Sequence, residues 1–129
     1  MIGSAVSDLP FLMLALISVL LTACSQLLLK AGVKGAMSSL PDGASLASVG
    51  VHFASNPLLW CGVGTMAVSL LSWMGALSRL EVSRAYPLTA LGIVLTVVAG
   101  RFLLGETLSG TRIAGSLLIV GGMILVARS

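Results

Sequence analysis

The residues best suited to binding a substrate form a polar line in the first apolar segment of the chain. Ser18, Thr22, Gln26 and Lys30 recur at every fourth position, with Ser25 beside them. Residues four apart lie close together on one face of a helix. Polar side chains inside a membrane usually face a helix bundle or a wet cavity rather than lipid. We therefore predict that this line contributes to a substrate-binding cavity, with simple hydrogen bonding to a neighbouring helix as the alternative.

The sequence contains no set of residues recognisable as a catalytic site for covalent chemistry. The one histidine stands in the first loop, the four acids are expected in termini or loops, and the two cysteines fall inside apolar segments: His52; Asp8, Asp42, Glu81 and Glu106; Cys24 and Cys61. Two isolated thiols and one histidine are too few ligands for a metal site, and the histidine has no cysteine or carboxylate at a useful spacing for catalysis. We predict no enzyme activity, no metal and no cofactor. The absence of an acid at mid-membrane depth also argues against proton-coupled export of cations.

The composition places these residues in a membrane. Hydrophobic residues make up 57% of the chain and charged residues only 9%, whereas a soluble domain carries about 25% charged residues. The formal charge of +3 is spread thinly, without a basic run. A nucleic-acid partner is therefore not expected, and the partner of most side chains must be the lipid bilayer.

Four apolar segments are long enough to span the bilayer, at about residues 11–30, 57–78, 85–104 and 110–127. Their apolar runs are continuous rather than alternating, which favours helices over a β-barrel. We predict an all-α integral membrane fold, with one domain of four transmembrane helices covering residues 1–129.

The connections between these segments differ in length. Residues 79–84 and 105–109 form short turns, so the last three helices should be antiparallel neighbours. Residues 31–56 form a longer surface loop. Leu46, Val49 and Phe53 recur in it at a helical spacing, which favours a short amphipathic helix on the membrane surface, with an irregular loop as the alternative.

The charges flanking the segments are nearly balanced between the two sides. Three arginines lie on the side of the termini, against two lysines and one or two arginines opposite: Arg79, Arg84 and Arg128; Lys30, Lys34, Arg112 and Arg101. The positive-inside rule then has little to act on, which permits an antiparallel dimer or an orientation set by a partner subunit. Gly115 and Gly122, on one face of the last segment, are the candidates for subunit packing.

Several motifs resemble the small multidrug resistance proteins and the wider drug/metabolite (EamA-like) transporter superfamily. They are residues 25–30 (SQLLLK), residues 92–95 (GIVL), residues 104–106 (LGE) and Gly115 in a glycine-containing last helix. The superfamily's drug exporters carry an acid where Thr22 stands and a tryptophan near Leu88. The closer likeness is to the two small subunits of the bacterial flippase for aminoarabinose linked to undecaprenyl phosphate, which share residues 85–87 (AYP).

This resemblance implies a transporter of the bacterial inner membrane that flips a lipid-linked sugar, working as a homodimer or with a paralogue. A lipid phosphate is anionic, and Lys30, Arg84 and Arg101 are cations near the membrane ends. Arginine matches phosphate well, although the two arginines could equally anchor the helices at the interface. Tyr86 joins the expected site through the shared motif. The alternatives are a small-solute or cationic-drug exporter of the same fold and a non-transporting partner subunit.

Overall fold

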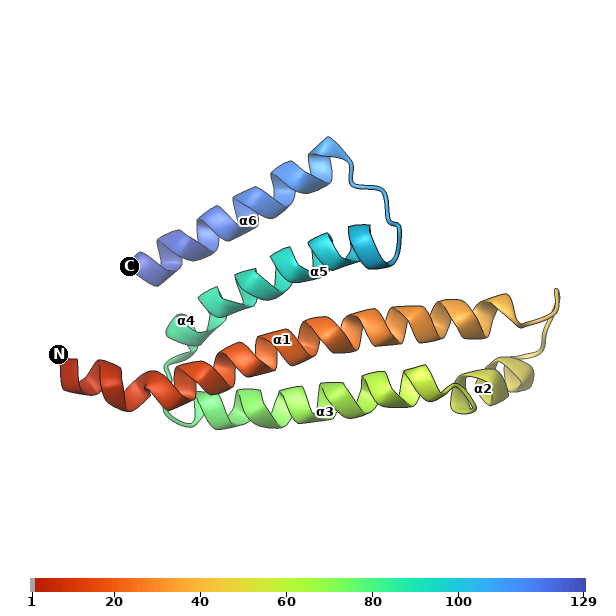
Figure 1. The fold of residues 1–129 in the computed structure, drawn as a ribbon, viewed down its shortest axis with the longest axis horizontal. Coiled ribbons are helices and arrows are strands. Elements are labelled where there is room, and N and C mark those ends of the chain that lie inside the picture. Colours follow the sequence, from red (N-terminus) through yellow and green to blue (C-terminus); the bar gives the residue numbers. More distant parts are fainter. Residues whose placement is uncertain (1) are drawn as a thin grey trace.

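The computed structural model describes residues 2–129, and this part of the chain contains helices and connecting loops but no strand. The elements are α1 (Ile2–Ser38), α2 (Leu46–Ala54), α3 (Pro57–Leu77), α4 (Val82–Ala85), the short 3-10 helix η1 (Tyr86–Leu88), α5 (Thr89–Leu103) and α6 (Gly110–Arg128). Figure 1 shows α1 running between α3 and α5, with α6 beyond α5 and both termini at the same end.

Four segments of residues 2–129 are long and apolar enough to cross a membrane: Val6–Ser38, Pro57–Leu77, Val82–Leu103 and Gly110–Arg128. The third combines α4, η1 and α5 in one span. Pro87 lies in the 3-10 turn at its start, where a residue without an N–H group is tolerated. The predicted all-α fold with four transmembrane helices is confirmed.

The expected end of the first helix was wrong. Helix α1 continues to Ser38, so residues 31–38 are helical and do not belong to the predicted surface loop 31–56. Within this extension Ala36 is buried, and the side-chain amide of Asn56 donates a hydrogen bond of 3.0 Å to the carbonyl of Gly32. The sequence offered no sign of the hydrogen bond because Asn56 lies 24 residues farther along the chain, just before α3.

The rest of that connection contains the short helix that was one of its two predicted forms. Helix α2 begins after Ser45, whose hydroxyl accepts a hydrogen bond from the N–H group of Ser48, as an N-cap residue does. The turn before it uses Gly43 at a φ of 77°, in the left-handed region that glycine occupies without steric cost.

Helices α1 and α3 approach each other very closely at two glycines. A Cβ atom at Gly62 would lie 2.8 Å from the side chain of Leu29, and one at Gly32 would lie 2.9 Å from the side chain of Leu59. Each helix thus offers a leucine to a glycine of the other. Small residues permit this close packing in membranes, where van der Waals contact replaces the hydrophobic effect between helices.

Helix α6 lies at the edge of the bundle (Figure 1). Within α6, all of which the structure describes, no residue is buried. A Cβ atom added at Gly115 or Gly122 would meet no atom of the described chain within 4 Å. The predicted role of these glycines in subunit packing stays a prediction, and the space beside them is unoccupied in the described chain.

Candidate functional site

Ser18 and Ser69 join α1 to α3 by reciprocal hydrogen bonds. The hydroxyl of Ser18 donates to the carbonyl of Ser69 over 2.8 Å, and the hydroxyl of Ser69 donates to the carbonyl of Ser18 over 2.8 Å. The hydroxyl of Thr22 lies 2.5 Å from that of Ser69. Both serines are almost fully buried. Ser18 and Thr22 therefore hydrogen-bond to the neighbouring helix, which is the alternative role that the sequence allowed.

Ser25 also serves packing. It is fully buried, donates a hydrogen bond of 2.8 Å to the carbonyl of Thr22 and contacts the sulfur of Met66. Ser25 does not belong to the described lining of either cavity. Its predicted part in substrate binding remains a prediction that this placement does not favour.

A large cavity of about 550 Å³ lies between α3 and α5, and residues of α1 also line it. Its wall is mainly apolar, with hydroxyl groups and two aromatic rings among the lining residues. Trp73 and Tyr86 meet edge to face there, with ring centroids 5.7 Å apart. The polar and aromatic lining comprises Ser18, Thr22, Ser69, Trp73, Tyr86, Thr89 and Thr96. Ser18, Thr22 and Tyr86, three of the predicted binding residues, line this cavity, and their part in substrate binding stays a prediction.

A second, charged cavity of about 360 Å³ lies farther along α1 toward the end opposite the termini. Gln26 and Lys30 of α1 line it together with Glu106 of the loop between α5 and α6. Thr96 lines both cavities. The two hollows therefore adjoin along α1, one mainly apolar and the other charged.

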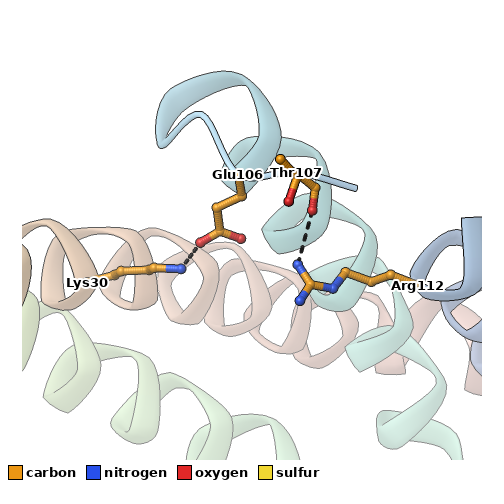
Figure 2. A network of polar contacts seen from close by, with 4 residues as sticks. All are labelled: Lys30, Glu106, Thr107 and Arg112. Carbon is orange, nitrogen blue, oxygen red and sulfur yellow. Dashed lines mark hydrogen bonds and ion pairs between the residues drawn. The ribbon is translucent and has the colours of Figure 1, made fainter. Parts of the chain in front are cut away.

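Lys30 and Glu106 form an ion pair across the charged cavity. Figure 2 shows the Lys30 side chain from α1 and the Glu106 side chain from the loop pointing toward each other. The lysine side chain is 56% exposed and the glutamate side chain 29%. A Cβ atom at Gly100 would lie only 3.0 Å from a Glu106 carboxylate oxygen. The glycine in α5 therefore provides the space that the carboxylate occupies.

The backbone around Glu106 is held independently of that carboxylate. Its N–H group donates to the carbonyl of Gly100 over 3.1 Å, and the Arg101 guanidinium donates to its carbonyl over 3.4 Å. Arg112 of α6 donates to the carbonyl of Thr107 over 3.4 Å (Figure 2). The loop is thus fixed to α5 and α6, whereas the Glu106 side chain reaches across to α1.

The predicted polar line separates into two parts because a helix has 3.6 residues per turn rather than four. Each step of four residues turns the side chain about 40° farther round the axis, so three steps amount to about 120°. Ser18 consequently meets α3 while Lys30 meets the loop after α5. The members of the line therefore have different neighbours, and their predicted part in a substrate-binding cavity stays a prediction.

Arg84 and Arg101, the other predicted cations, lie outside the described lining of both cavities. A guanidinium nitrogen of Arg84 lies 3.8 Å from a carboxylate oxygen of Asp8. Arg101 binds the loop backbone, as described above. Their part in substrate binding stays a prediction.

Glu106 was not among the predicted binding residues. Its position after Gly105 marked it as a loop residue, and the loop prediction is correct, since residues 105–109 have no regular structure. The available signal was the two glycines: Gly105 permits the turn, with a φ of 66°, and Gly100 leaves room for an acid. Neither signal could reveal that Lys30 would be the partner.

Comparisons with known proteins agree with this architecture. A probable 4-amino-4-deoxy-L-arabinose-phosphoundecaprenol flippase subunit ArnF of Erwinia tasmaniensis is 40% identical over 121 residues, which cover 89% of this chain and 92% of that subunit. Another ArnF subunit, of Shewanella sediminis, is 36% identical over 125 residues, covering 89% of this chain and 86% of that subunit.

The corresponding probable flippase subunit ArnE of Pseudomonas aeruginosa is 40% identical over 74 residues. That match covers 57% of this chain and spans only 64% of the subunit's length. No solved structure matches the chain. The EamA-like transporter family matches residues 4–128, which is nearly the whole sequence. This chain therefore belongs to the EamA-like transporter family.

Proposed function

We propose that this protein of the bacterial inner membrane is a small flippase subunit that moves a lipid-linked sugar phosphate across the bilayer. The observation that carries the proposal is the adjoining pair of cavities along α1, one mainly apolar and one charged, with Thr96 in both walls. A lipid-linked sugar has the same division, with an apolar chain attached to a phosphate and a sugar.

Solvation determines which part of the substrate each cavity would bind. Apolar groups gain free energy on leaving water, so the large cavity and the lipid beside it accept the prenyl chain near the phosphate. A phosphate needs a cation and hydrogen-bond donors when it leaves water. Lys30 supplies an ammonium and Gln26 an amide at the charged cavity. The relatives' printed names, which contain a sugar joined to phosphoundecaprenol, support this substrate class.

Transport in this proposal involves no covalent change in the substrate. Thr22 lines the large cavity, and Thr96 lines both cavities. The hydroxyls of these two residues offer hydrogen bonds to sugar hydroxyls as the headgroup moves along α1, while the prenyl chain stays in lipid.

We further propose that the working unit contains a second subunit, either another copy or a paralogue. The relatives are named as subunits. The exposed face of α6, with Gly115 and Gly122 uncovered, offers a surface on which a second helix can pack closely. A second subunit would also enclose the cavity between α3 and α5.

Reconstitution into liposomes tests the proposal. Liposomes would hold an amino-sugar phosphoprenol, and a membrane-impermeant amine reagent would score how much of it reaches the outer leaflet. We expect faster exchange than in protein-free liposomes, for the chain alone or with its paralogue. Lys30→Gln should slow it about tenfold, the effect of losing one charge-assisted contact.

Lys34→Gln is the matched control, since Lys34 is exposed on the next turn of α1 and lies outside the described lining of the charged cavity. Two results would contradict the proposal. One is exchange no faster than in protein-free liposomes, with and without the paralogue. The other is equal exchange by Lys30→Gln and the unchanged protein.

A further inference from the structure

We propose that the Lys30–Glu106 pair is a receptor for a zwitterionic headgroup, in which Lys30 takes the phosphate and Glu106 takes a sugar ammonium. This inference rests on the proposed function and adds the charge class of its substrate. Glu106 thereby becomes a residue that determines specificity.

The exposure of the pair indicates that folding stability is not its main contribution. With the lysine side chain 56% exposed and the glutamate 29%, water screens the attraction. Exposed ion pairs contribute only about 0–1 kcal/mol. The pair nevertheless forms part of the lining of a cavity, where its two charges are accessible to a solute.

The surrounding contacts allow the pair to open without unfolding the loop. The backbone of Glu106 is held by Gly100 and Arg101, so its side chain can rotate while the chain stays in place. Lys30 extends from the continuous helix α1, and its side chain is a flexible aliphatic chain that ends in the ammonium group. Opening therefore requires changes in side-chain torsions rather than in the fold.

Charge balance then selects the ligand. A sugar phosphodiester bearing a protonated amine has one negative and one positive charge, as the pair itself has. When such a headgroup enters, Lys30 exchanges the Glu106 carboxylate for the phosphate, and Glu106 exchanges the Lys30 ammonium for the sugar ammonium. A headgroup with phosphate but no amine would satisfy Lys30 and leave the Glu106 carboxylate without its cation, which is unfavourable in a partly desolvated site.

The described lining of the charged cavity contains one acid and one cation. Glu106 is the acid in the described lining of the charged cavity, and Lys30 is the cation there. The relatives' names include both an amino sugar and a phosphate, which is the chemistry that this pair matches.

Equilibrium binding to the full-length protein in nanodiscs tests the inference. Two short-chain prenyl phosphate sugars serve as probes, identical except that one carries an amine where the other carries a hydroxyl. Isothermal titration calorimetry measures both dissociation constants. The unchanged protein should bind the amine probe about tenfold more tightly, which corresponds to one charge-assisted contact.

The variants should change the two affinities in different ways. Glu106→Gln should weaken the amine probe about tenfold and leave the hydroxyl probe unchanged or tighter, because Lys30 is released from its carboxylate. Lys30→Gln should weaken both probes. Glu81→Gln, which alters an exposed acid outside the described cavity lining, should change neither. Glu106→Asp, which keeps the charge, should retain part of the preference.

The outcomes separate this inference from the proposed function. If the unchanged protein binds both probes equally and Glu106→Gln alters neither, the phosphate site stands and the amine receptor is overturned. If the protein binds neither probe, the proposed function and this inference both fail. If Glu106→Gln weakens both probes equally while its melting temperature is unchanged, Glu106 does not discriminate between headgroups, and the inference is also overturned.

Discussion

Helix α1 meets α3 and α5 in two different ways. Against α3 it is tightly packed, with a leucine over each of Gly32 and Gly62 and with serine hydroxyls bonded in both directions. Toward α5 it borders two cavities and an ion pair. One side of the same helix is thus built for a fixed geometry, and the other side keeps polar groups accessible to a ligand.

Glycine has a different use on each side. Gly62 lets two helix backbones approach, since the added Cβ would also lie 3.1 Å from the backbone nitrogen of Leu29. Gly100 instead makes room for the carboxylate of Glu106, and Gly92 for one methyl group of Val19. A side chain can move aside more readily than a backbone, so the α5 side should tolerate substitution better.

The largest stability effect is expected for Gly62→Ala. Its Cβ cannot be accommodated unless α1 and α3 separate, and overpacking of this kind costs about 1–3 kcal/mol. Denaturation in mixed detergent micelles, followed by circular dichroism, measures the loss. Gly64→Ala on the same helix is the control, because its Cβ would meet no described atom within 4 Å. Equal losses for the two variants would remove the distinction between the tight and open sides.

A smaller loss is expected for Ser69→Ala. The substitution removes the hydroxyl that donates to Ser18 and contacts Thr22, while the bond accepted by its backbone carbonyl remains. Interhelical hydrogen bonds in membranes contribute about 0.6–1.7 kcal/mol. The same denaturation assay applies. Ser72→Ala should lose less, because Ser72 bonds to Val68 of its own helix; the reverse order would contradict the interhelical role of Ser69.

Gly92→Ala probes the other side of α1 and should cost about 1 kcal/mol or less. Its Cβ would lie 3.0 Å from a methyl group of Val19, and the next atom of that residue is 3.8 Å away. Val19 lines the large cavity, so its side chain can shift toward open space. A loss as large as that of Gly62→Ala, in the same assay, would mean that the α1–α5 contact is equally rigid.

Gly122→Leu should leave the stability of the single chain within about 0.5 kcal/mol, because no described atom lies within 4 Å of the added Cβ. If α6 packs against a second subunit, the larger side chain should still lower the dimer fraction several-fold. Energy transfer between labelled copies in liposomes measures that fraction. Gly64→Leu on α3 is the control, and an unchanged dimer fraction would exclude this face of α6 from the interface.

Much of the fold was predictable because lipid imposes simple demands. Backbone groups in a membrane must be hydrogen-bonded within the segment, so long apolar runs predict helices, and four spans are observed, the first of them longer than predicted. The end of α1 was missed because Asn56, distant in sequence, bonds to the carbonyl of Gly32. Local patterns contain no information about such a contact.

The candidate site was only partly predictable for the same reason. Spacing placed Gln26 and Lys30 on the polar side of α1, and both line the charged cavity. It could not show that Ser18 would bond to Ser69 or that Ser25 would be buried beside Met66, since both contacts depend on the packing of α3.

The sequence by itself determined that the chain is a four-helix membrane protein with a polar first helix, because composition and run length decide how a segment partitions between water and lipid. Tertiary structure alone decided which polar groups stay accessible. The rotation of α1 carries Ser18 to α3 and Lys30 to Glu106, and a pairing between residues so distant in sequence exists only once the helices have packed.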